Sequence, residues 1–213
     1  MNIKQTIAAL VLAGSCLTLT ANAQKAYTEG IATYDLTTSI GAMQAKVLFR
    51  PDSNAFITQQ GPANIKAVSN TKGTYAVVLV DVPIASIKKA AILTPDEIEQ
   101  GEAKAPKFTF TTTAETKQIN GYNCKKVIAK DAASGSSTEI WVTTDITAPK
   151  NTLTKYFEAA GGFPVQFSTS QQGQTVGVTL KSITQEKLPA GSFGIPAGYD
   201  RITLDDLSKL GGR

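Results

Sequence analysis

Residues 117–145 read KQINGYNCKKVIAKDAASGSSTEIWVTTD, and this stretch decides the fold class. It predicts a strand, a tight turn, a second strand, a looser turn and a third strand. Asn120 and Gly121 form the pair that a type I′ hairpin turn prefers, because both central positions of that turn have positive φ. The Asp, Gly and Ser residues of 130–137 mark the second turn. Three consecutive antiparallel strands are therefore expected, and the single tryptophan, Trp141, lies on the third.

The first 23 residues have the features of a cleavable secretory signal. Lys4 precedes an apolar run over residues 7–19, and the small-residue pattern Ala21-Asn22-Ala23 closes the segment. Cleavage after Ala23 would release the protein into the periplasm. The alternative is a lipid anchor at Cys16, because residues 11–16 resemble a lipidation signal. The expected location is the periplasm in the first case and the membrane surface in the second.

The remaining residues, 24–213, are expected to form a single domain with a hydrophobic core of its own. Cys124 is the only cysteine beyond residue 23, so this part of the chain has no internal disulfide. Lys4 is the only charged residue among the first 23, and removing them lowers the net charge from +4 to +3. The charge is small and dispersed, with no Lys/Arg run longer than two residues, which argues against nucleic acid as a partner.

Apolar and polar residues alternate with a period of two over residues 43–50, 107–111 and 175–181, which predicts half-buried antiparallel strands. Residues 74–82 are apolar on both faces, and we expect them to form a central strand in a hairpin with residues 64–69.

Helical signals are few and short. Thr94 begins a capping box with proline at the first helical position, which predicts a helix to about Lys104. A second helix is expected over residues 152–160, ended by Gly161, and a third from Thr203 to Gly211.

Many strands and little helix predict a mainly β protein: a half-open antiparallel β-barrel with a few short covering helices. Thin helical cover leaves the inner face of a curled sheet incompletely packed, so an apolar cavity is expected there. A filled sandwich core is the alternative. The alternation assigns ten residues to the inner face, where each either packs as core or lines the cavity: Tyr34, Leu36, Val47, Phe49, Phe108, Phe110, Trp141, Val176, Val178 and Leu180.

Several segments together resemble a family of secreted Gram-negative proteins of unknown function. They are residues 30–34 (GIATY), 117–126 (KQINGYNCKK), 139–145 (EIWVTTD), 161–164 (GGFP) and 193–199 (FGIPAGY). By fold, that family is grouped with the periplasmic lipoprotein carriers of the LolA/LolB-like superfamily. The resemblance implies an open barrel with an apolar interior and a helical lid, but it transfers no carrier residue, because no motif matches position by position.

The residue types argue against catalysis. The chain has no histidine, and therefore lacks the usual general base at neutral pH and the commonest metal ligand. Cys124 lies on an expected strand, where a small buried hydrophobe is the simpler interpretation than a nucleophile. No spacing typical of a metal site, a calcium loop or a phosphate-binding loop is present, so neither a metal nor a cofactor is expected.

The function expected from the sequence is non-enzymatic binding or carriage of a hydrophobic moiety, such as a lipid or acyl chain. The partners are then a hydrophobic ligand or a lipidated protein, with peripheral contact to a membrane. The alternative is an envelope interaction or sensor protein that presents its curved sheet to another protein.

Overall fold

The computed structural model describes residues 24–39, 41–171 and 174–211, so the predicted signal segment and Cys16 lie outside the described residues. The strands are β1 (Lys25–Ala26), β2 (Gly30–Thr38), β3 (Gly41–Arg50), β4 (Ser53–Gln60), β5 (Ala63–Asn70), β6 (Ala76–Val82), β7 (Ile87–Ile92), β8 (Phe108–Ile119), β9 (Tyr122–Asp131), β10 (Ser137–Thr143), β11 (Ile146–Thr147), β12 (Phe163–Gln171), β13 (Gln174–Gln185) and β14 (Asp200–Ile202). The helices are α1 (Pro95–Ala103) and α2 (Leu204–Gly211), and the 3₁₀ segments are η1 (Pro83–Ala85) and η2 (Lys155–Ala160).

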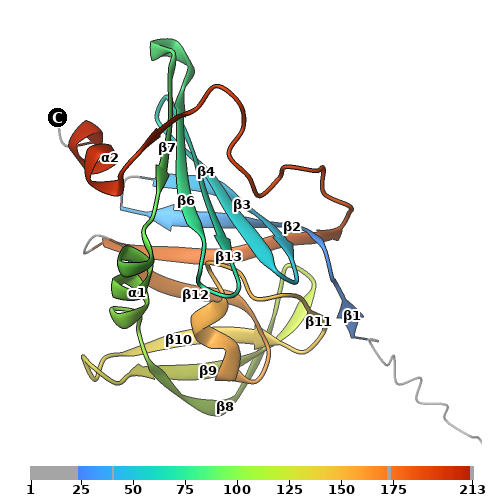
Figure 1. The fold of residues 1–213 in the computed structure, drawn as a ribbon. Helices are drawn as coiled ribbons and strands as arrows, with labels where there is room; N and C mark the ends of the chain where they lie inside the picture. The colour runs from blue at the N-terminus through green and yellow to red at the C-terminus, as the bar shows by residue number, and fades with distance from the viewer. Residues whose placement is uncertain (1–23, 40, 172–173, 212–213) are drawn as a thin grey trace, which may run out of the picture.

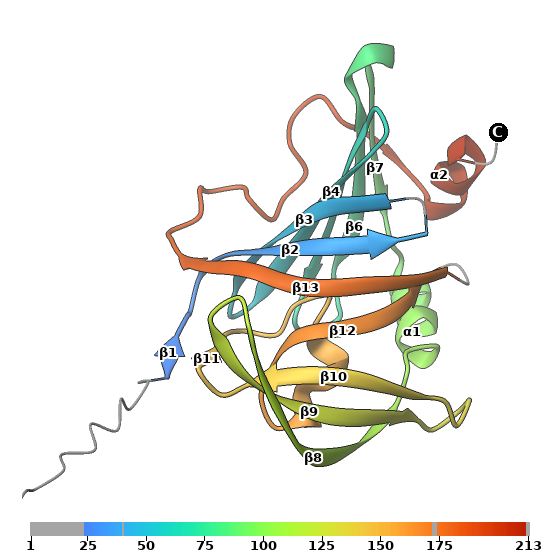
Figure 2. The same ribbon diagram turned by 180° about the vertical axis from the view of Figure 1, so that it is seen from behind.

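Twelve of these strands form one sheet in the order β14-β7-β6-β5-β4-β3-β2-β13-β12-β10-β9-β8. The sheet curls without joining its two edge strands, β14 and β8, as Figures 1 and 2 show. Neighbouring strands are antiparallel except for β14, which pairs in parallel with β7. The prediction of a mainly β, half-open fold with few helices is thus confirmed. Within the described ranges, no helix has the length and apolar character needed to cross a membrane.

The local signals in the sequence produce the expected turns and caps. Asn120 and Gly121 both have positive φ, at 48° and 86°, so the β8–β9 turn has the backbone that the pair Asn-Gly favours. The Thr94 side chain accepts a hydrogen bond from the Glu97 N–H, and the Glu97 side chain accepts one from the Thr94 N–H. This reciprocal capping box begins α1.

The second predicted helix is shorter than expected and is not an α-helix. Residues 155–160 form the 3₁₀ segment η2, with non-helical backbone angles at Phe157 (φ −108°, ψ 15°). Before it, the buried Asn151 side chain accepts a hydrogen bond from the Leu153 N–H, which holds the chain in a turn. A side chain that binds nearby backbone in this way competes with helix formation. Gly161, with φ of 80°, ends the segment as predicted.

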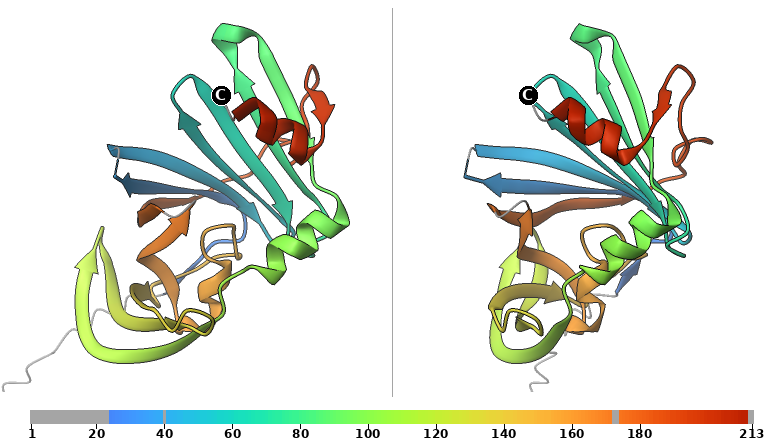
Figure 3. Two further views of the ribbon diagram at one scale, coloured as in Figure 1. Left: turned by 90° about the vertical axis from the view of Figure 1, so that its left-hand side faces the viewer. Right: turned by 60° about the vertical axis from the view of Figure 1, so that its left-hand side comes forward.

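The inner face of the sheet is divided into two parts. Strands β8, β9, β10, β12 and β13 form the part that we call the closed half, and residues 146–162, which include β11 and η2, pack inside its curve (Figure 3). Strands β4, β5, β6 and β7 form the open half. The main core cluster fills the closed half and the central strands β2 and β3.

The outer face of the open half carries a second core. Val68, Val77 and Leu79 are at most 2% exposed there, and Phe193 and Tyr199 from the C-terminal segment pack over them. The Arg50 guanidinium lies 4.6 Å from the centre of the Phe193 ring. From this segment the chain passes to β14 and then to α2, which packs against β7 (Figure 1).

Candidate functional site

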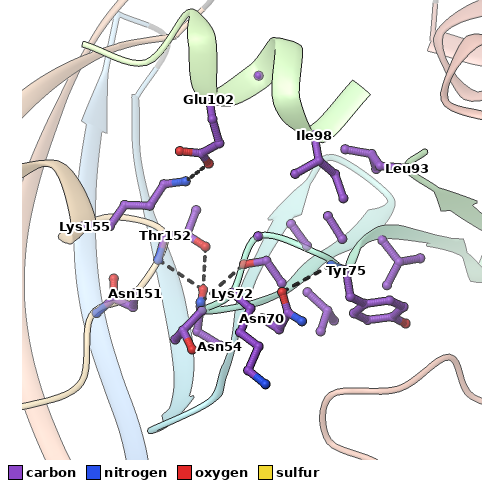
Figure 4. Close-up of a pocket in the computed structure, with 18 of the residues that line it drawn as sticks. Asn54, Asn70, Lys72, Tyr75, Leu93, Ile98, Glu102, Asn151, Thr152 and Lys155 are labelled. Atoms are coloured by element: carbon purple, nitrogen blue, oxygen red, sulfur yellow. Dashed lines mark hydrogen bonds and ion pairs between the residues drawn. The ribbon is translucent and has the colours of Figure 1, made fainter. Parts of the chain in front are cut away.

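A cavity of about 540 Å³ lies between α1 and the inner face of β5 and β6 (Figure 4). Its floor includes the cross-strand pair Ala67 and Val78, both partly exposed. Leu93 and Ile98 cover it from the β7–α1 connection and from α1 itself. The volume falls within the range of about 300 to 1,000 Å³ found for ligand sites.

Small floor side chains explain why this space is not filled. Val78 pairs with Ala67 on one side and with Ala91 on the other, and the next row joins Ser69 to Ala76. Alanine and serine reach only a short distance from the sheet, so α1 lies above the floor without interlocking with it. The small side chains thus leave a cavity with a largely apolar lining beneath α1.

Polar groups close one end of this cavity. Asn54, which is 5% exposed, accepts hydrogen bonds from the Thr152 N–H (3.1 Å) and the Thr152 hydroxyl (2.6 Å). Its amide also donates to the Ser69 hydroxyl at 3.3 Å. These bonds tie the segment of residues 146–162 to β4 and β5, although Asn54 and Thr152 are 98 residues apart in the chain.

An ion pair connects the same segment to α1. The Lys155 ammonium donates to Glu102 Oε1 at 2.5 Å across the rim of the cavity (Figure 4). Burial lowers the pKa of Lys155, but the hydrogen bonds to Glu102 and Tyr156 outweigh it and leave this pKa above its ordinary value. Lys72 also lines the rim, and among the described residues no salt-bridge partner for it is found. The rim therefore carries charges of both signs, with Lys155 paired to Glu102 and Lys72 outside the ion pairs found in the described chain.

Of the ten residues predicted for the inner face, seven pack as core in the main cluster. Each is at most 7% exposed, and none of them lines the cavity beneath α1: Tyr34, Leu36, Val47, Phe49, Val176, Val178 and Leu180. Cross-strand partners such as Tyr34 and Leu180, or Leu36 and Val178, show that they share one face. The alternation thus identified the face correctly, and on this part of it packing is complete.

Phe108 and Phe110 also point to the inner face, as their alternation predicts, with ring centroids 6.1 Å apart. Phe108 stacks on Phe157 at 5.5 Å, and Phe157 contacts Phe167 at 4.7 Å. A second cavity of about 660 Å³ adjoins Phe108, Phe157 and Phe167. This aromatic cluster holds η2 within the closed half.

Trp141 is placed on the opposite face of the sheet. Its cross-strand partners are Lys126 and Gln166, whereas its neighbour Ile140 is fully buried on the inner face. The Lys117 ammonium lies 4.0 Å from the centre of the indole ring, a cation–π contact. Because Ile140 and Val142 are apolar too, the sequence pattern alone does not decide which face the tryptophan takes.

The segment of residues 146–162 contributes to the lining of four cavities, including the two already described. It therefore occupies the middle of the concave side and separates the spaces around it. Gly162 lies so close to β10 that a Cβ atom there would stand 2.8 Å from the Thr143 carbonyl oxygen. Glycine at this position lets the chain return to the sheet as β12.

Cys124 is 2% exposed, and its thiol donates to the Tyr122 carbonyl oxygen at 3.5 Å. Burial raises the pKa of this thiol to about 11, so the thiolate needed for nucleophilic attack is scarce at neutral pH. Burial also raises the pKa of the Tyr34 hydroxyl, which lies in the core near Asn151. No cluster of potential metal ligands was found within the described part of the chain.

The residues that line the cavity beneath α1 were absent from the sequence-based prediction. One signal pointed towards them, because residues 74–82 are apolar on both faces and the β6 strand within them alternates between two environments. Val77 and Leu79 are buried on the outer face, whereas Val78 and Val80 on the inner face stay partly exposed. The inner face of β6 is therefore apolar and only partly covered by Leu93 and Ile98.

Residues 29–199 match a protein family described as Domain of unknown function (DUF4412). The chain belongs to this family. A search of curated proteins gave no match.

Solved structures with a similar fold are distant in sequence. An uncharacterized conserved protein from Thermus thermophilus is 9% identical, with a TM-score of 0.51 over 83% of this chain and 90% of that one. PNGF-II is 15% identical, with a TM-score of 0.51 over 86% of this chain, which spans only 33% of the PNGF-II chain. LprF from Mycobacterium bovis is 11% identical over 81% of this chain and 90% of that chain, but its TM-score of 0.37 is too low to support an argument. These likenesses show the fold of this DUF4412 member and no more.

Proposed function

We propose that the protein is a non-enzymatic, periplasmic binder of a lipid or acyl chain, and that the chain lies in the cavity beneath α1. The proposal rests on the exposure of apolar side chains on the inner face of the open half. On β5 and β6 this face is mainly apolar and partly exposed, and it borders a cavity of about 540 Å³ between Val78 and Ile98. An apolar guest gains free energy there in proportion to the surface that both sides remove from water.

The polar rim favours a guest with one anionic end. Lys72, Lys150 and Lys155 line the rim, opposed by Glu97 and Glu102. Lys150 and Lys155 are paired with Glu158 and Glu102, which leaves the Lys72 ammonium for a carboxylate or phosphate. A fatty acid or a lysophospholipid has this combination of an apolar chain and one anionic group.

Two features support binding without catalysis. The chain contains no histidine, and Cys124 lies in the core with its pKa raised by burial. The groups around the cavity are amides, hydroxyls and ion-paired lysines, which orient a ligand by hydrogen bonds and charge.

The test is to fill the cavity from its floor. Wild-type protein should bind a fluorescent fatty-acid analogue saturably, and Ala67→Phe should weaken that binding by about tenfold or more because the ring occupies the guest's space. Ala133→Phe is the matched control, since Ala133 is exposed in the β9–β10 turn away from the cavity. Absence of saturable binding to the wild type, or equal affinity in the Ala67→Phe variant, would contradict the proposal.

A second candidate function rests on β8. This strand of 12 residues forms one edge of the sheet, and most of its residues are exposed. A long exposed edge can accept a strand from a partner protein. Native mass spectrometry of the protein purified from its own envelope separates the two functions: a co-purifying lipid favours the cavity, whereas a stoichiometric protein favours the edge.

A further inference from the structure

The β6–β7 hairpin extends beyond the rest of the fold (Figures 1 and 2). Its tip, residues 82–87, reads VPIASI. Ile84 is 84% exposed and Ile87 is 37% exposed, whereas most isoleucines of the described chain are buried or partly buried. Pro83 and Ala85 are exposed beside them, so the tip is a contiguous apolar patch, and such patches can mark a contact with a protein or a membrane.

The tip has a defined conformation. Pro83 begins the 3₁₀ turn η1, and the Ser86 N–H donates to the Pro83 carbonyl oxygen at 3.1 Å. Ser86 adopts a left-handed conformation, with φ of 53°, and Val82 pairs with Ile87 across the hairpin. Proline has no N–H, and the turn satisfies a further backbone donor internally. Both features lower the cost of placing this backbone in an apolar medium.

An apolar path connects the tip with the cavity. The inner face of β6 carries three valines in alternate positions: Val82, Val80 and Val78. Val82 pairs with Ile87 on β7, and Val80 and Val78 pair with Ile65 and Ala67 on β5. All six of these side chains are at least partly exposed. The path therefore runs along β6 from the projecting Ile84 to the cavity floor. On its β7 side it is bordered by Lys89, the cross-strand partner of Val80, which is ion-paired with Asp200.

We propose that this hairpin tip inserts into the surface of a phospholipid bilayer and that an acyl chain passes between the bilayer and the cavity along β6. The inference rests on the proposed function for its second part. A bilayer fits the tip better than a protein does, because a stable protein interface needs about 800 Å² on each partner and a tip of six residues cannot supply that area. Hydrocarbon accepts a narrow apolar wedge without matching its shape.

Charge at the base of the tip agrees with this partner. Lys88 follows Ile87 directly and is exposed, so an insertion of the isoleucines would bring its ammonium towards the lipid phosphates. Its cross-strand partner is the partly buried Asp81, so the base of the tip carries one charge of each sign. The ammonium of Lys89, the next residue, is paired with the Asp200 carboxylate at 2.8 Å.

The first experiment reports contact at the tip itself. An environment-sensitive fluorophore is attached to Ile84→Cys in the full chain, with Cys16→Ser and Cys124→Ala to prevent other labelling, and vesicles of phosphatidylcholine and phosphatidylglycerol are added. The emission should shift to the blue and intensify. The same label at Ser136→Cys, in the distant β9–β10 turn, should not respond (Figure 2). No response at position 84, or an equal response at both positions, would overturn the proposal.

The second experiment separates the tip from the cavity. Ile84→Ser should slow transfer of a fluorescent fatty acid from vesicles to the protein by about tenfold, because the lost side chain contributes that much to membrane contact. Its equilibrium affinity for the same probe in vesicle-free solution should match the wild type. An unchanged transfer rate in the Ile84→Ser variant would overturn the role of the tip, even if the cavity binds the probe. Absence of probe binding to the wild type in vesicle-free solution would instead contradict the proposed function of the cavity.

Discussion

The closed and open halves are parts of one sheet, but the main covering segment packs on the inner face of the closed half and on the outer face of the open half. In the closed half, residues 146–162 pack on the inner face and place Phe157 between Phe108 and Phe167. In the open half, the C-terminal segment packs on the outer face and buries Val77 and Leu79. Stability of the open half therefore depends mainly on its outer face, and its inner face borders the cavity beneath α1.

The largest expected effect is the removal of the aromatic ring at the centre of the closed half. Phe157 is 4% exposed and contacts two other rings, so Phe157→Ala should lower the free energy of unfolding by about 3–5 kcal/mol. Urea unfolding followed by circular dichroism measures it. A loss below about 1 kcal/mol would mean that residues 146–162 do not pack as core.

A neighbouring pair on β6 tests the comparison within a single strand. Leu79 is 2% exposed on the outer face and does not line the cavity, and Val78 is partly exposed on the inner face and does. Leu79→Ala should cost about 2–4 kcal/mol of stability and leave probe affinity unchanged, whereas Val78→Ala should cost about 1 kcal/mol or less and alter probe affinity. The reverse pattern would exchange the roles assigned to the two faces.

Cys124 provides a smaller and pH-dependent effect in the closed half. Cys124→Ala should cost about 1–2 kcal/mol at neutral pH, from lost burial, and leave probe binding unchanged. The pKa of the buried thiol is raised from 9.0 to about 11, so the unfolded chain ionises first as the pH rises. The thiol therefore lowers the free energy of unfolding between about pH 9 and pH 11. Unfolding curves across this range should show a shallower decline in the alanine variant, and identical slopes would contradict the assignment.

The smallest effect is expected at the ion pair between α1 and η2. Lys155 and Glu102 are 35% and 54% exposed, and water screens their attraction. Lys155→Met should lower the free energy of unfolding by less than about 1 kcal/mol. Thermal unfolding in low and high salt measures it; a loss of several kcal/mol would show that the pair, and not the apolar packing, holds α1 over the cavity.

What the sequence predicted correctly depends on local chemistry. Positive φ at Asn120 and Gly121, the capping box at Thr94 and the shared face of Phe108 and Phe110 each follow from residues close together in the chain. The alternation also identified the inner face of the central strands, and the balance of many strands against little helix predicted the half-open fold.

What could not be predicted depends on contacts between distant segments. Asn54 holds Thr152 across 98 residues, and this contact places residues 146–162 in the concavity. Phe193 and Tyr199 cover the outer face of the open half by an equally long-range return of the chain. Period-two alternation reports which residues share a face, but not which face another segment will cover. Seven of the ten predicted residues therefore pack as core, and the cavity beneath α1 lies over Ala67 and Val78.

The most direct test of the account is a crystal structure of the protein with a fatty acid brominated at its chain end. The anomalous signal of bromine gives the position of the end of the acyl chain directly. The account predicts the bromine on the inner face of β5 and β6, between Val78 and Ile98 beneath α1. A bromine beside Phe108 and Phe167 in the closed half, or no ordered bromine at saturating ligand, would contradict it.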